Sequence, residues 1–273
     1  MVQANLGGIN SRTRELEEQA ITGLAISRPS DAPELTAAVS EQGVFGKNAG
    51  QATAVLDTMD SALGRGHDAL ARAREIAVQM ATGTMSADER AIAAQEVAAL
   101  RDTVLEVANT SYAGRYVFAG NAYDTEPFAA DGSYSGSSGE PSARVGENTW
   151  VSTGRDGSAV FSGSVDILAA LDTFAAALNA DDDAGISAAI DNIDLGLDAL
   201  ATARTEVGND TNVALDATEL SESLGTDLQT RVDDLAAADP AEVYMQVSAM
   251  RNAYTSALQV AASARGQTLF DLL

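Results

Sequence analysis

The stretch that decides the fold is residues 186–235, which read ISAAIDNIDLGLDALATARTEVGNDTNVALDATELSESLGTDLQTRVDDL. Apolar or small residues recur along it at steps of three and four, and it contains no proline. This heptad spacing is typical of a helix that packs along one narrow seam. It predicts an unbroken helix of roughly 50 residues, about 75 Å long at the usual rise per residue. A globular domain rarely contains such a rod, so we expect an elongated molecule.

A second heptad seam runs from Ala52 to Met80 in the first half of the chain. It stops at residues 82–84, after which Ser86 and Glu89 have the spacing of a capping box that begins another helix. Glycines at positions 43, 46 and 50 precede the seam. We expect these glycines to mark a flexible bend before the first long helix.

The amino-acid composition changes between the two helical halves, where residues 119–163 are rich in Gly, Ser and Asp. Short runs of β-forming residues lie among turn signals at 123–128, 134, 149–151 and 159–161. This composition predicts a small β insert between the two halves.

Both ends of the chain carry short helical seams. Near the C-terminus, Asp239 is placed to cap a helix whose first position is Pro240. Each seam is one-sided and too short to be stable alone in water, so we expect other subunits to cover it and the ends to be unfolded before assembly. The predicted assembly-interface residues are Leu16, Ala20, Val243, Val247, Met250, Tyr254, Leu258, Leu269 and Leu272.

The predicted fold is therefore mainly α: an elongated antiparallel bundle of long helices, with paired terminal coiled-coil helices and a small β insert. We expect three domains. Residues 1–45 and 236–273 form a terminal coiled-coil assembly domain. Residues 46–118 and 164–235 form a long-helix rod domain, and residues 119–163 form the insert.

Charge narrows the possible partners. The 16 Lys and Arg residues against 40 Asp and Glu residues give a formal net charge of −24. Such a surface repels phosphate, and the chain has no basic stripe, so nucleic acid and anionic membranes are poor partners. The N-terminus lacks a signal peptide, and no stretch is long and apolar enough for membrane insertion. If the protein leaves the cell, we expect another exporter to carry it.

The chemistry of an enzyme is missing from the sequence. There is no cysteine, and His67 is the single histidine, so thiol catalysis, a histidine base with a partner and a zinc cluster are all unsupported. Acidic turns at 131–133 and 181–183 lack the ligand spacing of a calcium loop. We therefore expect no catalytic residue, metal or cofactor.

Three separated motifs resemble the flagellin-like hook-associated protein 3 family, the hook-filament junction proteins of bacterial flagella. They are RPSDAP at 28–33, GRYVFAG at 114–120 followed by DTEPF at 124–128, and the helical end at 257–273. Ala32 departs from the family box, and both the insert and the first helix are short for the family. The motif residues are Arg28, Pro29, Ser30, Asp31, Pro33, Gly114, Arg115, Tyr116, Phe118, Gly120, Pro127 and Phe128.

The resemblance implies a structural component of the flagellum that joins the hook to the flagellin filament. It implies export without a cleaved signal through the flagellar type III apparatus, and an extracellular location at the hook-filament junction. The implied partners are further copies of the chain in a ring-like helical layer, the hook-side junction protein, flagellin and an export chaperone.

Three alternatives stay open from the sequence. A divergent flagellin that forms the filament itself would be abundant. A secreted enzyme built on a flagellin frame would need its active site in the insert, which lacks His and Cys. If the protein were a coiled-coil adhesin, the flagella of a strain that lacks it would keep their filaments.

Overall fold

A computed structural model describes residues 2–23, 33–82, 85–237 and 239–270. The chain divides into two compact units. The first, which we call the terminal unit, consists of Met1–Glu41 and Ser223–Leu273. The second, Gln42–Glu222, we call the rod unit. The mainly helical prediction is confirmed, whereas the three-domain boundaries stay a prediction.

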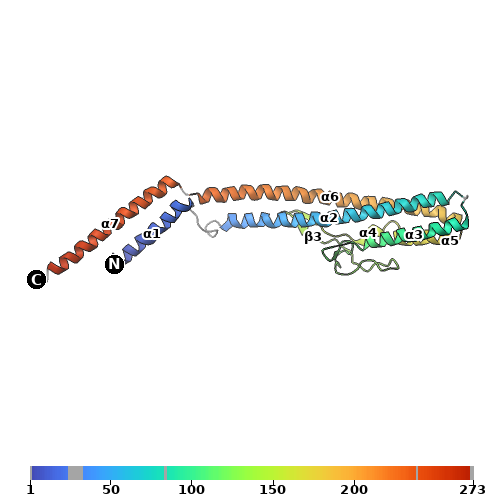
Figure 1. Ribbon diagram of the computed structural model, residues 1–273, viewed down its shortest axis with the longest axis horizontal. Helices are drawn as coiled ribbons and strands as arrows, with labels where there is room; N and C mark the ends of the chain where they lie inside the picture. Colours follow the sequence, from blue (N-terminus) through green and yellow to red (C-terminus); the bar gives the residue numbers. More distant parts are fainter. Residues whose placement is uncertain (1, 24–32, 83–84, 238, 271–273) are drawn as a thin grey trace. The chain divides into compact units, whose positions relative to one another are not determined.

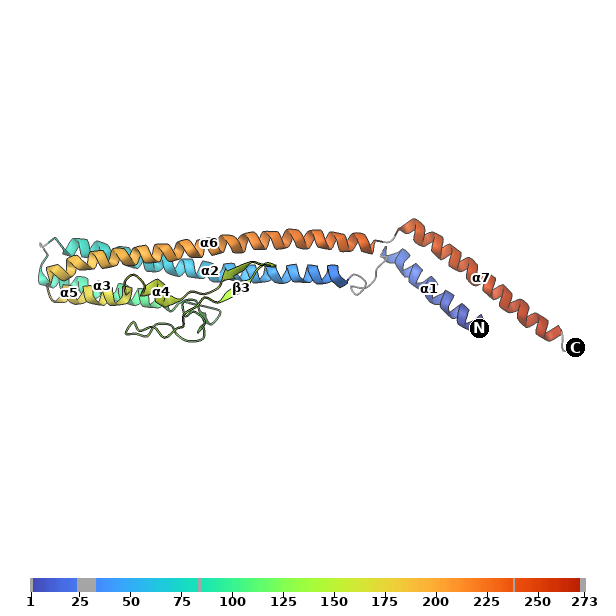
Figure 2. The same cartoon turned by 180° about the vertical axis from the view of Figure 1, so that it is seen from behind.

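Two long helices, α2 (Pro33–Met80) and α6 (Asp183–Ala236), lie side by side in the rod unit, which contains all of α2 from Gln42 on and all of α6 up to Glu222 (Figures 1 and 2). Hydrogen bonds and ion pairs between them show that the helices are antiparallel, since the residue numbers of the partners on α6 fall as those on α2 rise. The Ser221 hydroxyl donates to the Gln42 carbonyl, and Arg204 donates to Asp60 over 2.9 Å. Further along, Arg74 pairs with Asp194. The predicted unbroken helix is confirmed, because α6 runs for 54 residues.

The seam between these helices is apolar, as the heptads predict. Leu56, Met59, Leu63 and Leu70 of α2 are buried, together with Leu200 of α6. Their burial provides the main stabilisation of the pair, because the hydrophobic effect scales with the apolar area removed from water.

The predicted bend before the first long helix is wrong. The helix α2 continues through all three glycines, at positions 43, 46 and 50. A Cβ at Gly46 would lie 3.2 Å from the Ser221 hydroxyl oxygen of α6, which is a tight contact. At this position the missing side chain lets two helices approach closely, and helical context outweighs the glycine propensity.

Two shorter helices pack together in the rod unit, α3 (Ala87–Ala108) and α5 (Ile167–Asn179). The predicted capping box is confirmed: the Ser86 hydroxyl accepts from the Glu89 N–H, and the Glu89 carboxylate accepts from the Ser86 N–H over 2.8 Å. Buried Arg90 of α3 binds Asp181 at 2.7 Å and Asp183 at 2.6 Å. The acidic turn at 181–183 therefore secures the start of α6.

Two small antiparallel hairpins follow α3: β1 (Ser111–Tyr112) with β2 (Arg115–Tyr116) lies just before the insert, and β3 (Ser142–Arg144) with β4 (Trp150–Ser152) lies within it. The strand predicted at 159–161 is wrong, because these residues end a short helix, α4 (Gly157–Phe161). Its start is fixed by the Asp156 carboxylate, which accepts from the Ser158 N–H over 2.9 Å.

Three phenylalanines tie the insert to the helices of the rod unit. The ring centroid of Phe161 lies 5.2 Å from that of Phe118 and 5.6 Å from that of Phe128, in edge-to-face arrangements. All three side chains are essentially inaccessible and belong to the core that contains the α2, α3 and α6 seams. The insert is thus part of the rod core.

Candidate functional site

The terminal unit pairs helix α1 (Val2–Thr22) with helix α7 (Pro240–Phe270). Leu16 is buried against Val243 and Val247, and Met250 packs beside them. Arg251 of α7 donates to Glu17 of α1 over 2.7 Å. The start of α7 is capped as predicted, since the Asp239 carboxylate accepts from the Ala241 N–H at 2.9 Å. Four of the predicted interface residues therefore hold the two terminal helices together within one chain.

The other predicted interface residues divide into two groups. Ala20 and Tyr254 are exposed on α1 and α7. The side chains of Leu258 and Leu269, and Leu272 as a whole, lie outside the described part of the structure.

Sequence reasoning missed the outward apolar residues of the same helices. Ile21 is 87% exposed, Tyr244 67% and Met245 68%. Large apolar side chains this accessible are typical of contact surfaces when they gather on one element. The heptad pattern accounts for one apolar stripe of α7, which includes Val243. Tyr244 and Met245 follow Val243 directly and lie outside this stripe, and this position in the sequence could have indicated a second contact surface.

The family-motif residues of the rod unit meet where α3 ends and the insert begins. Gly114 has a φ of 81° in the tight turn between β1 and β2, and Gly120 has a φ of 60°. A Cβ at Gly120 would overlap the Ser137 carbonyl oxygen, so this position requires glycine. Buried Phe128 is fixed through its backbone, because its N–H donates to Asn109 over 2.9 Å and its carbonyl accepts from the same amide at 2.8 Å.

The remaining motif residues differ in how deeply they are buried. Phe118 is in the core, Pro127 is buried, Tyr116 is half-buried and Arg115 is exposed. Pro33 is the first residue of α2. Arg28, Pro29, Ser30 and Asp31 lie outside the described residues.

Arg155 is a buried cation of the insert that sequence reasoning also missed. It donates to Glu140 over 2.7 Å and pairs with Asp210 of α6 at 2.5 Å. Glu206 lies 4.0 Å away. Burial raises the pKa of Asp210, while the positive charge of Arg155 acts against this rise. The arrangement fastens the insert to α6, and no local sequence pattern could have indicated partners so far apart in the chain.

Among the described residues, no group of three or more His, Cys, Asp or Glu side chains could hold a metal ion. His67 is half-buried on α2, with its ring nitrogen 3.9 Å from Asp68. No helix in the described part of the chain is long and apolar enough to cross a membrane.

Long antiparallel helices, a paired set of terminal helices and a small β insert define a flagellin-like structural protein. In agreement, the model of the bacterial flagellin N-terminal helical region matches residues 1–123. A flagellar hook-associated protein 3 from Escherichia coli is 30% identical over 263 residues, which cover 83% of this chain and 82% of that protein. The chain belongs to the flagellar hook-associated protein 3 family, a family of structural flagellar proteins and not of enzymes.

Further comparisons agree with this family and fold. The hook-associated protein 3 of Salmonella typhimurium is 27% identical over 310 residues, covering 100% of this chain and 97% of that protein. A putative flagellar hook-associated protein from Vibrio parahaemolyticus has a TM-score of 0.68 at 18% identity, over 77% of this chain and 99% of that one. A flagellar junction protein from Legionella pneumophila has a TM-score of 0.60 at 16% identity, over 81% and 98%. These structural likenesses show a shared fold.

Proposed function

We propose that this chain is a structural component of the bacterial flagellum that joins the hook to the flagellin filament. The observation that carries the proposal is the 30% identity to a hook-associated protein 3 over more than four fifths of both chains. That match is too long to be confined to one end of the chain, so it spans helices of the rod and insert residues together. The function is mechanical, and it depends on the surfaces through which the chain contacts other subunits.

The terminal unit is the proposed assembly element. Its small cluster of Leu16, Val243 and Val247 holds α1 and α7 together, and exposed Tyr244 and Met245 are available to neighbours. The described side chains of these two helices share only this small cluster, so the pair gains stability when further subunits bury its outer faces. In this proposal residues 1–45 and 236–273 are the assembly domain, 46–118 and 164–235 the rod, and 119–163 the insert.

The proposed partners follow from a position between two polymers. Copies of the chain form a ring-like layer, with the hook-side junction protein on one side and flagellin on the other. A chaperone accompanies the chain to the flagellar type III exporter, and no signal peptide is cleaved. The location is the hook-filament junction outside the cell.

A null strain tests this function directly. Loss of the gene is expected to leave hooks without filaments and to release flagellin into the medium, and both are restored by the wild-type gene. Electron microscopy and an immunoblot of the medium measure the two outcomes. Normal filaments in the null strain would refute the proposal.

The match to the flagellin N-terminal region also favours a second candidate, a divergent flagellin that forms the filament. Quantification separates the two functions. A junction protein is present in a few copies for each flagellum and labels only the filament base with antibody. A flagellin is the most abundant protein of the isolated filament and labels its whole length.

A further inference from the structure

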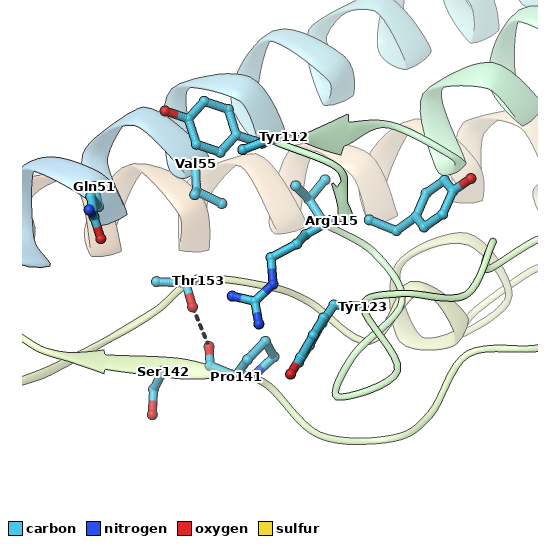
Figure 3. Close-up of a pocket in the computed structure, with 11 residues that line it drawn as sticks. Gln51, Val55, Tyr112, Arg115, Tyr123, Pro141, Ser142 and Thr153 are labelled. Carbon is cyan, nitrogen blue, oxygen red and sulfur yellow. Dashed lines mark hydrogen bonds between the residues drawn. The ribbon is translucent and has the colours of Figure 1, made fainter.

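The rod unit has a groove of about 580 Å³ between α2 and the insert. Its wall includes Gln51, Tyr112, Arg115, Tyr123, Pro141 and Thr153 (Figure 3). The Arg115 guanidinium lies in the groove beside the Tyr123 ring, and its carbon is 3.8 Å from the centroid of that ring (Figure 3). We call this site the Arg115 groove.

The charge of the groove is opposite to that of the chain as a whole. None of the 11 residues that line it is Asp or Glu, although the chain contains 40 such residues. A second hollow of about 400 Å³ has Glu140, Asp156, Asp198 and Glu206 in its wall. The Arg115 groove is therefore a cationic site on a strongly acidic protein.

Many cations of the chain already have a carboxylate partner, as Arg90, Arg155 and Arg204 do within the rod unit. Arg115 is an exposed cation for which the described residues offer no ion pair, a property that it shares with Arg65. Arg115 differs from Arg65 because it lines the groove and stacks on an aromatic ring. Stacking on Tyr123 covers one face of the guanidinium plane and orients its N–H groups, which suit a carboxylate in bidentate geometry.

We propose that the Arg115 groove receives an aspartate or glutamate side chain of a neighbouring copy of this chain. The inference rests on the proposed function, which places copies side by side in one layer. Each copy carries a charge of −24, so neighbours repel unless contacts pair charges of opposite sign. A cation already neutralised within its own chain offers little to a neighbour. Arg115 is free for this contact, and the Tyr112 ring and Gln51 provide a wall for the incoming segment.

Site-specific cross-linking in isolated flagella tests the contact. The photoreactive residue p-benzoylphenylalanine replaces Tyr112, which is 37% exposed at the groove. Irradiation is expected to give a product of twice the chain mass, and mass spectrometry is expected to identify a partner peptide of this same chain that contains Asp or Glu. The chain present in flagella but uncross-linked, or joined only to another protein, would overturn the inference and leave the proposed function intact. Absence of the chain from flagella would refute both.

Charge variants then test the role of the guanidinium. Arg115→Gln is expected to lower the yield of this cross-link several-fold, and Arg115→Lys to lower it less, because lysine keeps the charge without the bidentate geometry. Arg65→Gln is the matched control, since Arg65 is an exposed cation of α2 outside the groove. Equal yields in all variants would overturn the inference. Arg115→Glu combined with a change of the identified carboxylate to Arg is expected to restore the yield.

Discussion

The rod unit and the terminal unit are both built from antiparallel helices, yet the cores formed by their described side chains differ greatly in size. The rod unit buries leucines and methionines from α2, valines from α3 and the rings of Phe118, Phe128 and Phe161 in one continuous cluster. Among the side chains that the structure describes, the cluster of the terminal unit consists of Leu16, Val243 and Val247 with Met250 beside it. The rod therefore has the core of an independently folding domain, whereas the terminal helices depend on additional contacts.

The strongest test of the rod core is a substitution that creates a large cavity at its centre. Phe161→Ala removes a fully buried ring that contacts Phe118 and Phe128. We expect it to lower the free energy of unfolding by about 3–5 kcal/mol, as for other buried aromatic truncations. Chemical denaturation followed by circular dichroism measures the loss. Val44→Ala is the control, because Val44 is 52% exposed on α2 and its truncation should change little.

Arg155→Ala tests how firmly the insert is attached to α6. The variant leaves Asp210 without its buried partner, and we expect a loss of roughly 1–3 kcal/mol, moderated because water reaches Glu140 and Glu206. Without the arginine nothing opposes the effect of burial, so the pKa of Asp210 rises further. A carboxyl whose folded pKa is raised destabilises the fold once it ionises. The loss should therefore shrink as the pH falls towards the pKa of Asp210, and a loss that stays constant with pH would contradict this arrangement.

The capping box at the start of α3 predicts a smaller effect that is also lost in acid, although here the pKa of the carboxyl is lowered instead of raised. Hydrogen bonds from the Ser86 N–H and hydroxyl lower the pKa of Glu89. A lowered folded pKa contributes stability above the unfolded value of about 4.5, and this contribution is lost as the pH falls through the folded value. Glu89→Gln should thus melt slightly below wild type at pH 7, and the two melting temperatures should converge in acid. A difference between the two melting temperatures that grows in acid would contradict the role of the capping box.

These predictions also show what the sequence could and could not determine. The heptads predicted α6 and the Ser86–Glu89 spacing predicted the start of α3, because both signals lie within one helix. Residues 159–161 have β-forming side chains, yet the Asp156 cap and the burial of Phe161 make them helical. Here tertiary packing outweighed local propensity.

The candidate site was predicted less completely. The heptads placed Leu16, Val243 and Val247 on seams, but a seam does not specify whether its partner is the same chain or a neighbour. The long-range partners of Arg155 and the carboxylate-free wall of the Arg115 groove depend on residues far apart in the sequence. The family resemblance was confirmed by the relatives, whereas the interface residues stay predictions.

Met250→Asp is expected to have the smallest effect on the rod and a large effect on assembly. Met250 packs beside the terminal cluster, and an unpaired charge there is costly once neighbours bury it. Secretion and the main unfolding transition should match wild type, while the variant fails to restore filaments in a null strain. Val39→Asp, on the half-buried surface of α2, tests whether any new acidic residue in the terminal unit has the same effect. Normal swimming with Met250→Asp would refute the assembly role of this position.

Native-state hydrogen exchange of the isolated chain tests the difference between the two units most directly. The rod is expected to exchange slowly, with the greatest protection from Leu56 to Ala77, where α2 lies in the large core. Both terminal helices, α1 and α7, are expected to exchange faster by orders of magnitude and to become protected only in assembled flagella. Equal protection of α1, α7 and the core of α2 in the dilute isolated chain would contradict the account, because the terminal helices would then be stable without neighbours.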